Sequence, residues 1–551
     1  MPPIIRLLLI IVLLTYSANL TTAQSLPDST RDKIDRLFAQ WDRQPIPGCV
    51  AGVVMGDQLV YAKGFGLAQL EQRLASTPES IYYMCSVSKQ FAGYAVAYLV
   101  NEGKIRLEED IHTYVPSLQD LGSKVTVENL LHHTSGLRDD IRLMDLFGLG
   151  GSGLLTQELG MRIIRQQHSL NFEPGTKYAY SNSNYVLLAE IVAHVSGTSF
   201  RRFTDSVIFK PLQMTNSFFA DDPYALMPGL APSYSFSNGQ WRNARQQVYT
   251  LGDGGLFTSL QDMSKWVRHY WSPDGATQQV MQLFTATQPL KDGRRNYYAM
   301  GISVDTVNGR RRLLHNGSLA GYRTVVLAYP DQQLGFVVFG NGSDNAVYNK
   351  VMEMSDLLLP PVANQGGNVR TESPTTGTAL PDSNKVRKLA GAYIAANGYR
   401  VDVSWQRGAL YVGSNELAPA SFTEFYIRNR PAVRYRFAGE TLQLISPAMA
   451  LPIELQSAGA APTGAALKNY VGRYHSDELD CRFTISLQEG KLVIEHIRLG
   501  KADMVLVGPD HGVTQAAFIR HLLFTRDHRG RITGFDYNDG DIMHLHFSKE
   551  R

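Results

Sequence analysis

The sequence predicts an α+β protein that ends in two small, mostly β modules. Apolar residues at helical spacing, as at Phe91, Tyr94 and Leu99, indicate buried helices, whereas short apolar runs separated by turn residues indicate antiparallel hairpins. In the last third of the chain, a near-repeat indicates two similar modules. These three observations predict one large domain of helices and antiparallel sheet, followed by the two modules.

The first part of the chain carries the patterns of one helix and two hairpins. Gly56-Asp57 is a favourable two-residue turn between two apolar runs, and Pro330-Asp331-Gln332-Gln333 joins another two. The expected elements are a helix over residues 27–41, a hairpin of residues 49–55 and 58–61, and a hairpin of residues 324–329 and 334–339.

Residues 364–383 are rich in Gly, Thr, Ser and Pro, which predicts a linker. After it, Gly391-Ala392-Tyr393 recurs as Gly472-Arg473-Tyr474 and Gly408-Ala409-Leu410 recurs as Gly490-Lys491-Leu492, each about eighty residues later. Alternating segments between these points predict strands, and small barrels close their own edges. The predicted organisation is a large domain over 24–363, the linker, a first β module over 384–462 and a second over 463–551.

The N-terminus has the pattern of a targeting segment. Arg6 precedes the apolar stretch 7–14, and Thr21-Thr22-Ala23 places small residues before Gln24. This predicts a signal peptide over 1–23, cleaved after Ala23, and export to a periplasm or the extracellular space. An uncleaved anchor fits less well because the apolar run is short for a bilayer, and no stable membrane insertion of the mature chain is expected.

The net charge and the cysteine content give no indication of a nucleic-acid-binding protein or of a disulfide-stabilised fold. The 551 residues include 53 Lys and Arg against 50 Asp and Glu, a net charge of +3 that is too mild to indicate a nucleic-acid partner. Three cysteines, Cys49, Cys85 and Cys481, cannot all pair with one another, and their spacing indicates no disulfide framework. Cys85 is interpreted as a small buried residue.

Ser86-Val87-Ser88-Lys89 stands directly before an apolar helical run that ends near Asn101-Glu102-Gly103. Ser86 is therefore expected at a helix N-terminus, with Lys89 one turn later on the same face. An amine held there can activate a serine hydroxyl, and free helix N–H groups can stabilise an oxyanion. The tetrapeptide alone is weak evidence for a catalytic site, since an ordinary polar helix start has the same sequence pattern.

Two more motifs carry candidate site residues. Tyr180-Ser181-Asn182 follows the turn signal Glu173-Pro174-Gly175 and precedes an apolar helix; the tyrosine can move a proton and the asparagine amide can orient a carbonyl, although a helix cap has the same pattern. His315-Asn316-Gly317 follows Leu313-Leu314 at the expected end of a strand. Glycine there would let substrate lie against the backbone and would aim the Ser318 N–H at a carbonyl, whereas a surface turn is the alternative.

Ser-x-x-Lys, Tyr-x-Asn and His-x-Gly in this order resemble the penicillin-recognising serine hydrolases, which include class C β-lactamases, DD-carboxypeptidases, D-aminopeptidases and related esterases. The resemblance covers roughly residues 31–358 and implies a β-lactamase/transpeptidase-like domain, with an antiparallel sheet, flanking helices and a helical subdomain. The layout with two C-terminal β-barrels resembles that of D-aminopeptidases. Further segments that look alike are 130–137, 180–190 and 254–259.

The resemblance implies that Ser86 is the nucleophile and that Lys89 and Tyr180 share the acid/base role, with the first base left open. It implies that Asn182, His315 and Gly317 bind substrate and that the Ser86 and Ser318 amides form the oxyanion hole. The expected activity is hydrolysis, through an acyl-enzyme, of short peptides or amides with a D-residue, cell-wall fragments among them. No metal or organic cofactor is expected, and the oligomeric state is left open.

Alternatives within the same superfamily are an esterase and a weak β-lactamase, and the alternative of another class is a non-catalytic receptor or sensor. His315 stands where the lactamase branch usually has the lysine of Lys-Thr-Gly, which lowers the expectation of efficient β-lactam hydrolysis. Since an unperturbed imidazole titrates at about pH 6.5, activity is expected to change across that pH.

Several other patterns are discounted. Gly148 to Gly153 spells a dinucleotide-binding motif without a preceding strand, which favours a flexible loop. His132-His133 and His544-Leu545-His546 lack acidic or cysteine partners at ligand spacing, so structural or surface roles are expected.

Overall fold

The structure is a computed structural model. It describes residues 26–42, 45–149, 153–343, 346–359, 383–395, 398–428, 430–446, 453–516, 518–540 and 542–550. The signal peptide predicted over 1–23 and nearly all of the predicted linker lie outside the described residues. The described residues belong to two compact units, one within Met1–Ile105, Val195–Gln288 and Tyr297–Val362, the other within Arg106–His194, Pro289–Asn296 and Ala363–Arg551.

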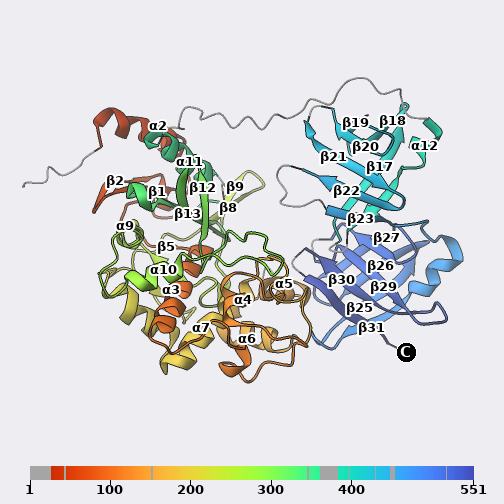
Figure 1. The fold of residues 1–551 in the computed structure, drawn as a ribbon, viewed down its shortest axis with the longest axis horizontal. Helices are drawn as coiled ribbons and strands as arrows, with labels where there is room; N and C mark the ends of the chain where they lie inside the picture. The colour runs from red at the N-terminus through yellow and green to blue at the C-terminus, as the bar shows by residue number, and fades with distance from the viewer. Residues whose placement is uncertain are drawn as a thin grey trace, which may run out of the picture. The chain divides into compact units, whose positions relative to one another are not determined.

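A six-stranded antiparallel sheet forms the centre of the first unit, with the strand order β12-β13-β14-β15-β1-β2 (Figure 1). Both predicted hairpins are present, β1 with β2 and β14 with β15. β1 and β15, the first and last strands of this sheet along the chain, pair with each other. The strands are β1 (Cys49–Met55), β2 (Gln58–Phe65), β12 (Ser303–Val307), β13 (Arg310–Leu319), β14 (Tyr322–Tyr329) and β15 (Leu334–Gly340).

Helices cover both faces of this sheet. On one face, α2 (Asp28–Asp42) and α11 (Ala346–Leu358) share an apolar core with the strands, and α2 confirms the helix predicted over 27–41. On the other face lies α9 (Leu260–His269). Glycines in β1 and β15 make room for it: a Cβ on Gly52 would lie 2.8 Å from Leu260, and one on Gly335 would lie 2.3 Å from Val267. Alternating side chains along each strand therefore serve two separate cores.

The helix that follows Ser86 is buried within the first unit. A short 3-10 turn η1 (Cys85–Ser88) leads into α3 (Lys89–Asn101), whose Phe91 ring packs 4.4 Å from the Trp266 ring of α9. The remaining elements of this unit are α8 (Phe200–Thr204), the π-turn η3 (Asp205–Phe209), α10 (Gln278–Phe284), the sheet β5-β11-β7 (Tyr82–Tyr83, Leu256–Thr258, Phe218–Phe219), β3 (Leu67–Gln69), β4 (Leu74–Ala75), β8 (Tyr234–Ser237), β9 (Gln240–Asn243), β10 (Val248–Tyr249) and η4 (Pro330–Gln332).

The second unit combines a helical part with two barrels. Its helical part contains η2 (Ile111–Thr113), α4 (Val127–Leu131), α5 (Asp140–Leu146), β6 (Leu155–Thr156), α6 (Gln157–Arg165) and nearly all of α7 (Asn182–Ser196). Threonine or aspartate caps α4, α5 and α6, as expected for side chains that accept the free N–H groups of a first turn. Across the described ranges, no helix has both the length and the apolar character needed to cross a bilayer.

Each predicted β module is a closed eight-stranded antiparallel barrel (Figure 1). Pairing of β16 with β23 closes the first, and pairing of β24 with β31 closes the second. The first barrel follows α12 (Ser383–Arg387) and contains β16 (Gly391–Ile394), β17 (Arg400–Gln406), β18 (Ala409–Val412), β19 (Asn415–Pro419), β20 (Glu424–Ile427), β21 (Arg430–Ala438), β22 (Thr441–Ile445) and β23 (Ile453–Ser457). The second follows η5 (Gly464–Tyr470) and contains β24 (Gly472–Ser476), β25 (Cys481–Gln488), β26 (Lys491–His496), β27 (Gly500–Leu506), β28 (His511–Thr514), β29 (His521–Arg526), β30 (Ile532–Asp539) and β31 (Ile542–Lys549).

The sequence repeat is a structural repeat. Gly408 and Gly490 occupy the same turn between the second and third strands of each barrel, and in both turns this glycine and the residue before it have positive φ. Two successive residues with positive φ are the signature of the tight hairpin turn that matches strand twist. Tyr393 and Tyr474 also match, since each hydroxyl donates to the carbonyl four residues earlier, at 3.1 and 2.7 Å.

All three cysteines are described, and each is a buried thiol rather than half of a disulfide. Burial raises the pKa of the Cys481 thiol to about 12 and that of Cys85 still further. Because the reactive form of cysteine is the thiolate, Cys85 is an inert packing residue, as the sequence indicated.

Candidate active site

Ser86 lies in a tight turn between β5 and α3. The residue before it, Cys85, has a φ of +50°, a left-handed conformation that is costly for a residue with a side chain. Cys85 is 2% exposed, so its buried side chain keeps this conformation in place. The turn brings Ser86 to the start of α3, where the sequence predicted it.

Lys89 begins α3 and is fully buried. Its Nζ lies 3.4 Å from Ser86 Oγ and donates to the Asp253 carbonyl at 2.7 Å. The amine is thus aimed at the serine from inside the protein, within reach for proton transfer once it is neutral. The contact has the geometry expected from one helical turn; the catalytic roles of the two residues stay predictions.

The His-x-Gly motif does not end a strand, contrary to the expectation. β13 continues through Leu319, and His315, Gly317 and Ser318 pair with Val326, Thr324 and Arg323 of β14. The local sequence has turn-forming residues, but a complete partner strand keeps the segment extended.

Gly317 brings β13 against the turn that carries Ser86. A Cβ at this position would lie 2.6 Å from the Met84 carbonyl oxygen and 2.7 Å from Cys85 Cβ, far inside van der Waals contact. Close packing of the strand on the nucleophile turn therefore explains the glycine. Its part in substrate binding stays a prediction.

His315 is buried and neutral. Its Nδ1 lies 2.7 Å from the Asn316 carbonyl, which can only accept, so Nδ1 carries the proton and Nε2 accepts from the Tyr298 hydroxyl at 2.8 Å. Burial, with a smaller contribution from the nearby Lys89 charge, lowers the pKa of His315 to about 3. The expectation that activity follows His315 titration near pH 6.5 is therefore wrong, because the barrier to charging it is its buried position.

Beside the motif, β13 faces solvent through Asn316 and Ser318, which alternate with the buried His315 and Gly317. Asn316, Gly317 and Ser318 line a cavity of about 370 Å³, with Arg323 and Tyr348 on its wall. The assignment of the Ser318 amide to an oxyanion hole stays a prediction.

Tyr180 and Asn182 belong to the second unit, and their place opposite Ser86 stays a prediction from the resemblance. The Tyr180 ring packs on the His133 imidazole with centroids 4.3 Å apart. His133 Nδ1 accepts from the Ser181 N–H at 3.2 Å and from Asn184 Nδ2 at 3.0 Å. His133 thus supports the Tyr-x-Asn loop, which is the structural role the sequence favoured.

Asp139 fixes Asn182. One carboxylate oxygen, Oδ2, accepts from both the Asn182 N–H at 2.7 Å and its side-chain Nδ2 at 2.8 Å, while Oδ1 accepts from the Arg142 N–H at the start of α5. Asp139 therefore holds both the backbone N–H and the side-chain amide of Asn182. The oxygen of a side-chain amide can accept from a substrate amide or an ammonium group.

The sequence patterns did not reveal the contacts that Asp139, Asp253 and Tyr298 make with the motif residues. Asp139 follows the segment 130–137 that the resemblance singled out, so it could have been suspected as a partner of the Tyr-x-Asn loop. Asp253 acts through its backbone carbonyl, which no side-chain pattern reveals.

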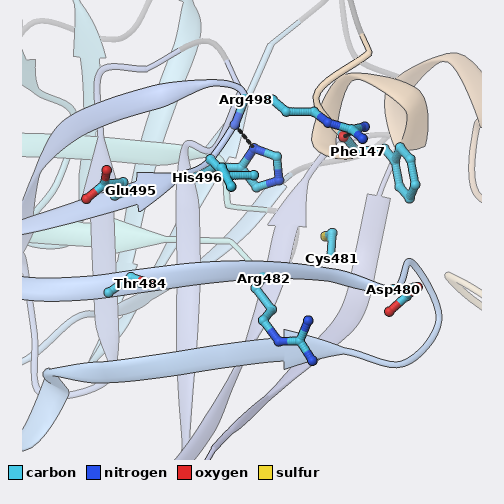
Figure 2. Close-up of a pocket in the computed structure, with 9 residues that line it drawn as sticks. Phe147, Asp480, Cys481, Arg482, Thr484, Glu495, His496 and Arg498 are labelled. Atoms are coloured by element: carbon cyan, nitrogen blue, oxygen red, sulfur yellow. Dashed lines mark hydrogen bonds between the residues drawn. The ribbon is translucent and has the colours of Figure 1, made fainter.

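A cavity of about 520 Å³ lies at the second barrel, and none of the motif residues lines it (Figure 2). The Arg498 guanidinium lies 5.4 Å from the Phe147 ring centre, and the Arg498 N–H donates to His496. In the part of the chain that the structure describes, no three His, Cys, Asp or Glu side chains gather in a way that could hold a metal ion.

The chain is similar to known hydrolases along most of its length. A sequence profile of the family described as Beta-lactamase matches residues 34–359. A D-aminopeptidase of Brucella melitensis biotype 2 is 27% identical over 89% of this chain and 93% of its own length. A D-aminopeptidase of Gluconobacter oxydans is 29% identical over 54% of this chain, spanning only 56% of that relative's length.

Solved structures show the same fold. An octameric penicillin-binding protein homologue from Pyrococcus abyssi matches with a TM-score of 0.55 and 24% identity, over 78% of this chain and 99% of that one. A D-amino acid amidase from Ochrobactrum anthropi, complexed with L-phenylalanine amide, matches with a TM-score of 0.52 and 18% identity, over 60% and 98%.

Gly317→Ala is expected to destabilise the protein by about 1–3 kcal/mol, because the added methyl must displace Met84 or Cys85. The same displacement moves the turn that holds Ser86, so labelling of Ser86 by a fluorophosphonate is expected to slow. Urea unfolding and labelling rates measure the two effects. The matched control is Gly275→Ala, since a Cβ there meets open space at an ordinary φ; equal behaviour of the two variants would contradict the packing argument.

The free energy of unfolding is expected to fall as the pH is lowered, because the pKa of His315 is lowered to about 3 in the folded protein. The unfolded chain takes up this proton near pH 6.5, so the contribution is complete above that pH and is lost as the pH falls toward 3. In urea unfolding, wild type should lose more free energy between pH 7 and pH 5 than His315→Asn. An equal loss in both proteins would contradict the lowered pKa.

Proposed function

Because the chain belongs to the beta-lactamase family, whose profile covers residues 34–359, we propose that it hydrolyses short peptides and amides that carry a D-residue. It is a serine hydrolase of this family, and it resembles D-aminopeptidases along 89% of its length, the two barrels included. That full-length similarity supports an aminopeptidase or amidase reaction over other reactions of the fold.

The observation that carries the proposal is the buried Lys89 Nζ, 3.4 Å from Ser86 Oγ. In its neutral form this amine removes the hydroxyl proton as Ser86 attacks the substrate carbonyl. The proton then passes to the leaving amine, and water hydrolyses the acyl-enzyme. Backbone N–H groups of Ser86 and Ser318 are the proposed donors to the oxyanion.

Tyr180 and Asn182 complete the proposed site. Tyr180 shares the proton transfer with Lys89, and Asn182, whose backbone and side-chain N–H groups donate to Asp139, accepts from the substrate through its amide oxygen. An ammonium group at the N-terminus of a D-residue is a donor of the kind that this oxygen prefers.

The neutral state of His315 favours a peptidase whose substrates have no charged carboxylate at this side of the site. A substrate carboxylate needs a fixed positive partner when it leaves water, and an imidazole with a pKa of about 3 provides none at neutral pH. Substrates whose C-terminal end is uncharged therefore suit this side of the site better than free carboxylates.

Export to a periplasm or the extracellular space is part of the proposal. It rests on the N-terminal pattern of Arg6, the apolar stretch 7–14 and the small residues before Gln24.

Ser86→Ala is expected to lower turnover of D-alanine p-nitroanilide by at least about 10³-fold, because no nucleophile remains for the acyl-enzyme. The assay compares D- and L-anilides, p-nitrophenyl acetate and a chromogenic cephalosporin, with Ser272→Ala as the serine control, since Ser272 is exposed and lies outside the motifs. Preference for the acetate ester would favour the esterase, and rapid cephalosporin hydrolysis would favour the β-lactamase. Folded wild type that is neither active nor labelled at Ser86 by a fluorophosphonate would favour the receptor.

D-Alanyl-D-alanine amide is expected to be cleaved with a kcat/KM at least equal to that of free D-alanyl-D-alanine. The free acid must desolvate a carboxylate without a charged partner at His315. The rate at which each peptide disappears measures the ratio. Preference for the free acid by about tenfold or more, equivalent to about 1.4 kcal/mol, would contradict the argument.

A further inference from the structure

A buried ion pair joins the second barrel to the helical part of the second unit. Arg138 Nη1 lies 2.8 Å from Glu478 Oε1, and the two side chains are 0% and 4% exposed. Glu478 stands between β24 and β25, whereas Arg138 directly precedes Asp139 and α5. Its burial separates this pair from the many exposed ion pairs of the barrels.

The barrel provides more than the carboxylate. Arg138 Nε donates to the Met543 carbonyl of β31 at 3.0 Å, and the Met543 N–H donates to Asn171 Oδ1 at 2.7 Å. Ser169 accepts from Arg138 Nη1 through its carbonyl at 2.7 Å and from Nη2 through its hydroxyl at 2.9 Å. Every nitrogen of the guanidinium thus donates at least one hydrogen bond, and removal of Glu478 would leave a buried charge without its counter-ion.

The residues around Arg138 also hold the start of α7. The Arg138 carbonyl accepts from Ser183 Oγ at 2.7 Å, and the next residue, Asp139, binds the backbone and side chain of Asn182. Ser183 Oγ in turn accepts from the Asp140 N–H at 2.8 Å. The consecutive residues Arg138, Asp139 and Asp140 therefore connect the Glu478 carboxylate to the start of α7, with no flexible segment between them.

We propose that Glu478 is a positioning residue for the reaction: through Arg138 it fixes Asp139, and Asp139 sets the orientation of the Asn182 amide. The second barrel is then a part of the active site's support rather than an accessory module. This proposal depends on the proposed function in one respect, namely that Asn182 contacts the substrate.

Amide hydrogen exchange tests the relay without any assay of turnover. In full-length Glu478→Gln, exchange of the Asn182 N–H is expected to accelerate by about tenfold or more, because its acceptor Asp139 loses its anchor. Exchange at Leu188, in the buried middle of α7, should keep its wild-type rate. The matched control is Glu550→Gln, which removes a carboxylate from the same barrel but from the exposed partners Arg473 and Arg482.

An unchanged rate at Asn182, or equal acceleration at Asn182 and Leu188, would overturn the proposal. If Glu478→Gln does not fold, the double variant Arg138→Gln/Glu478→Gln removes both charges together and is measured in the same way.

Kinetics provide the second readout. Glu478→Gln is expected to lower kcat/KM by about tenfold or more, in keeping with the cost of a misplaced substrate-binding group. Added to Asn182→Ala, the same change should cause no further loss, because both act through one contact. If the losses in kcat/KM from Glu478→Gln and Asn182→Ala multiply in the double variant, the proposal is overturned. If wild type is inactive, the proposed substrates are wrong, and the hydrogen-exchange result alone decides whether Glu478 positions Asn182.

Discussion

The close approach of β13 to the turn before α3 is the constraint on which the described half of the site depends. Only glycine allows it, because any side chain at Gly317 would occupy the space of Met84 and Cys85. The approach places a strand beside Ser86 while the helix that starts at Lys89 brings an amine to the same hydroxyl. Strand β13 and the start of α3 thus pack on the two sides of the same short turn, residues 84–86.

Burial then decides the charges around Ser86. Lys89 is fully buried with a carbonyl acceptor, and His315 is neutral chiefly because its burial disfavours a charged imidazole, with a smaller contribution from the nearby Lys89 charge. The pattern His-x-Gly suggested a group that changes charge near neutrality, yet the surrounding protein removes that property. A residue type indicates which chemistry is available, and its environment selects the form that is present.

Much of the fold could be predicted from local patterns. The turn Gly56-Asp57, the segment 330–333 and the repeat near Gly408 and Gly490 each depend on backbone preferences of a few adjacent residues, and the structure confirms the corresponding hairpins and barrels. The prediction that the strand ends at His315 was wrong, because hydrogen bonds to β14 outweigh the local turn preference. Asp139 and Asp253 were missed because contacts between distant segments leave no periodic trace in the sequence.

By itself, the sequence determined the order of the motifs, the spacing of Ser86 and Lys89, and the two repeated barrels, since each follows from residues that are neighbours in the chain. Only the tertiary structure decided that His315 is neutral, that Gly317 serves packing and that Glu478 of the second barrel binds Arg138 beside Asp139. The reason is physical: desolvation, close contact and buried ion pairing depend on which distant groups surround a residue, and that is set when the chain folds.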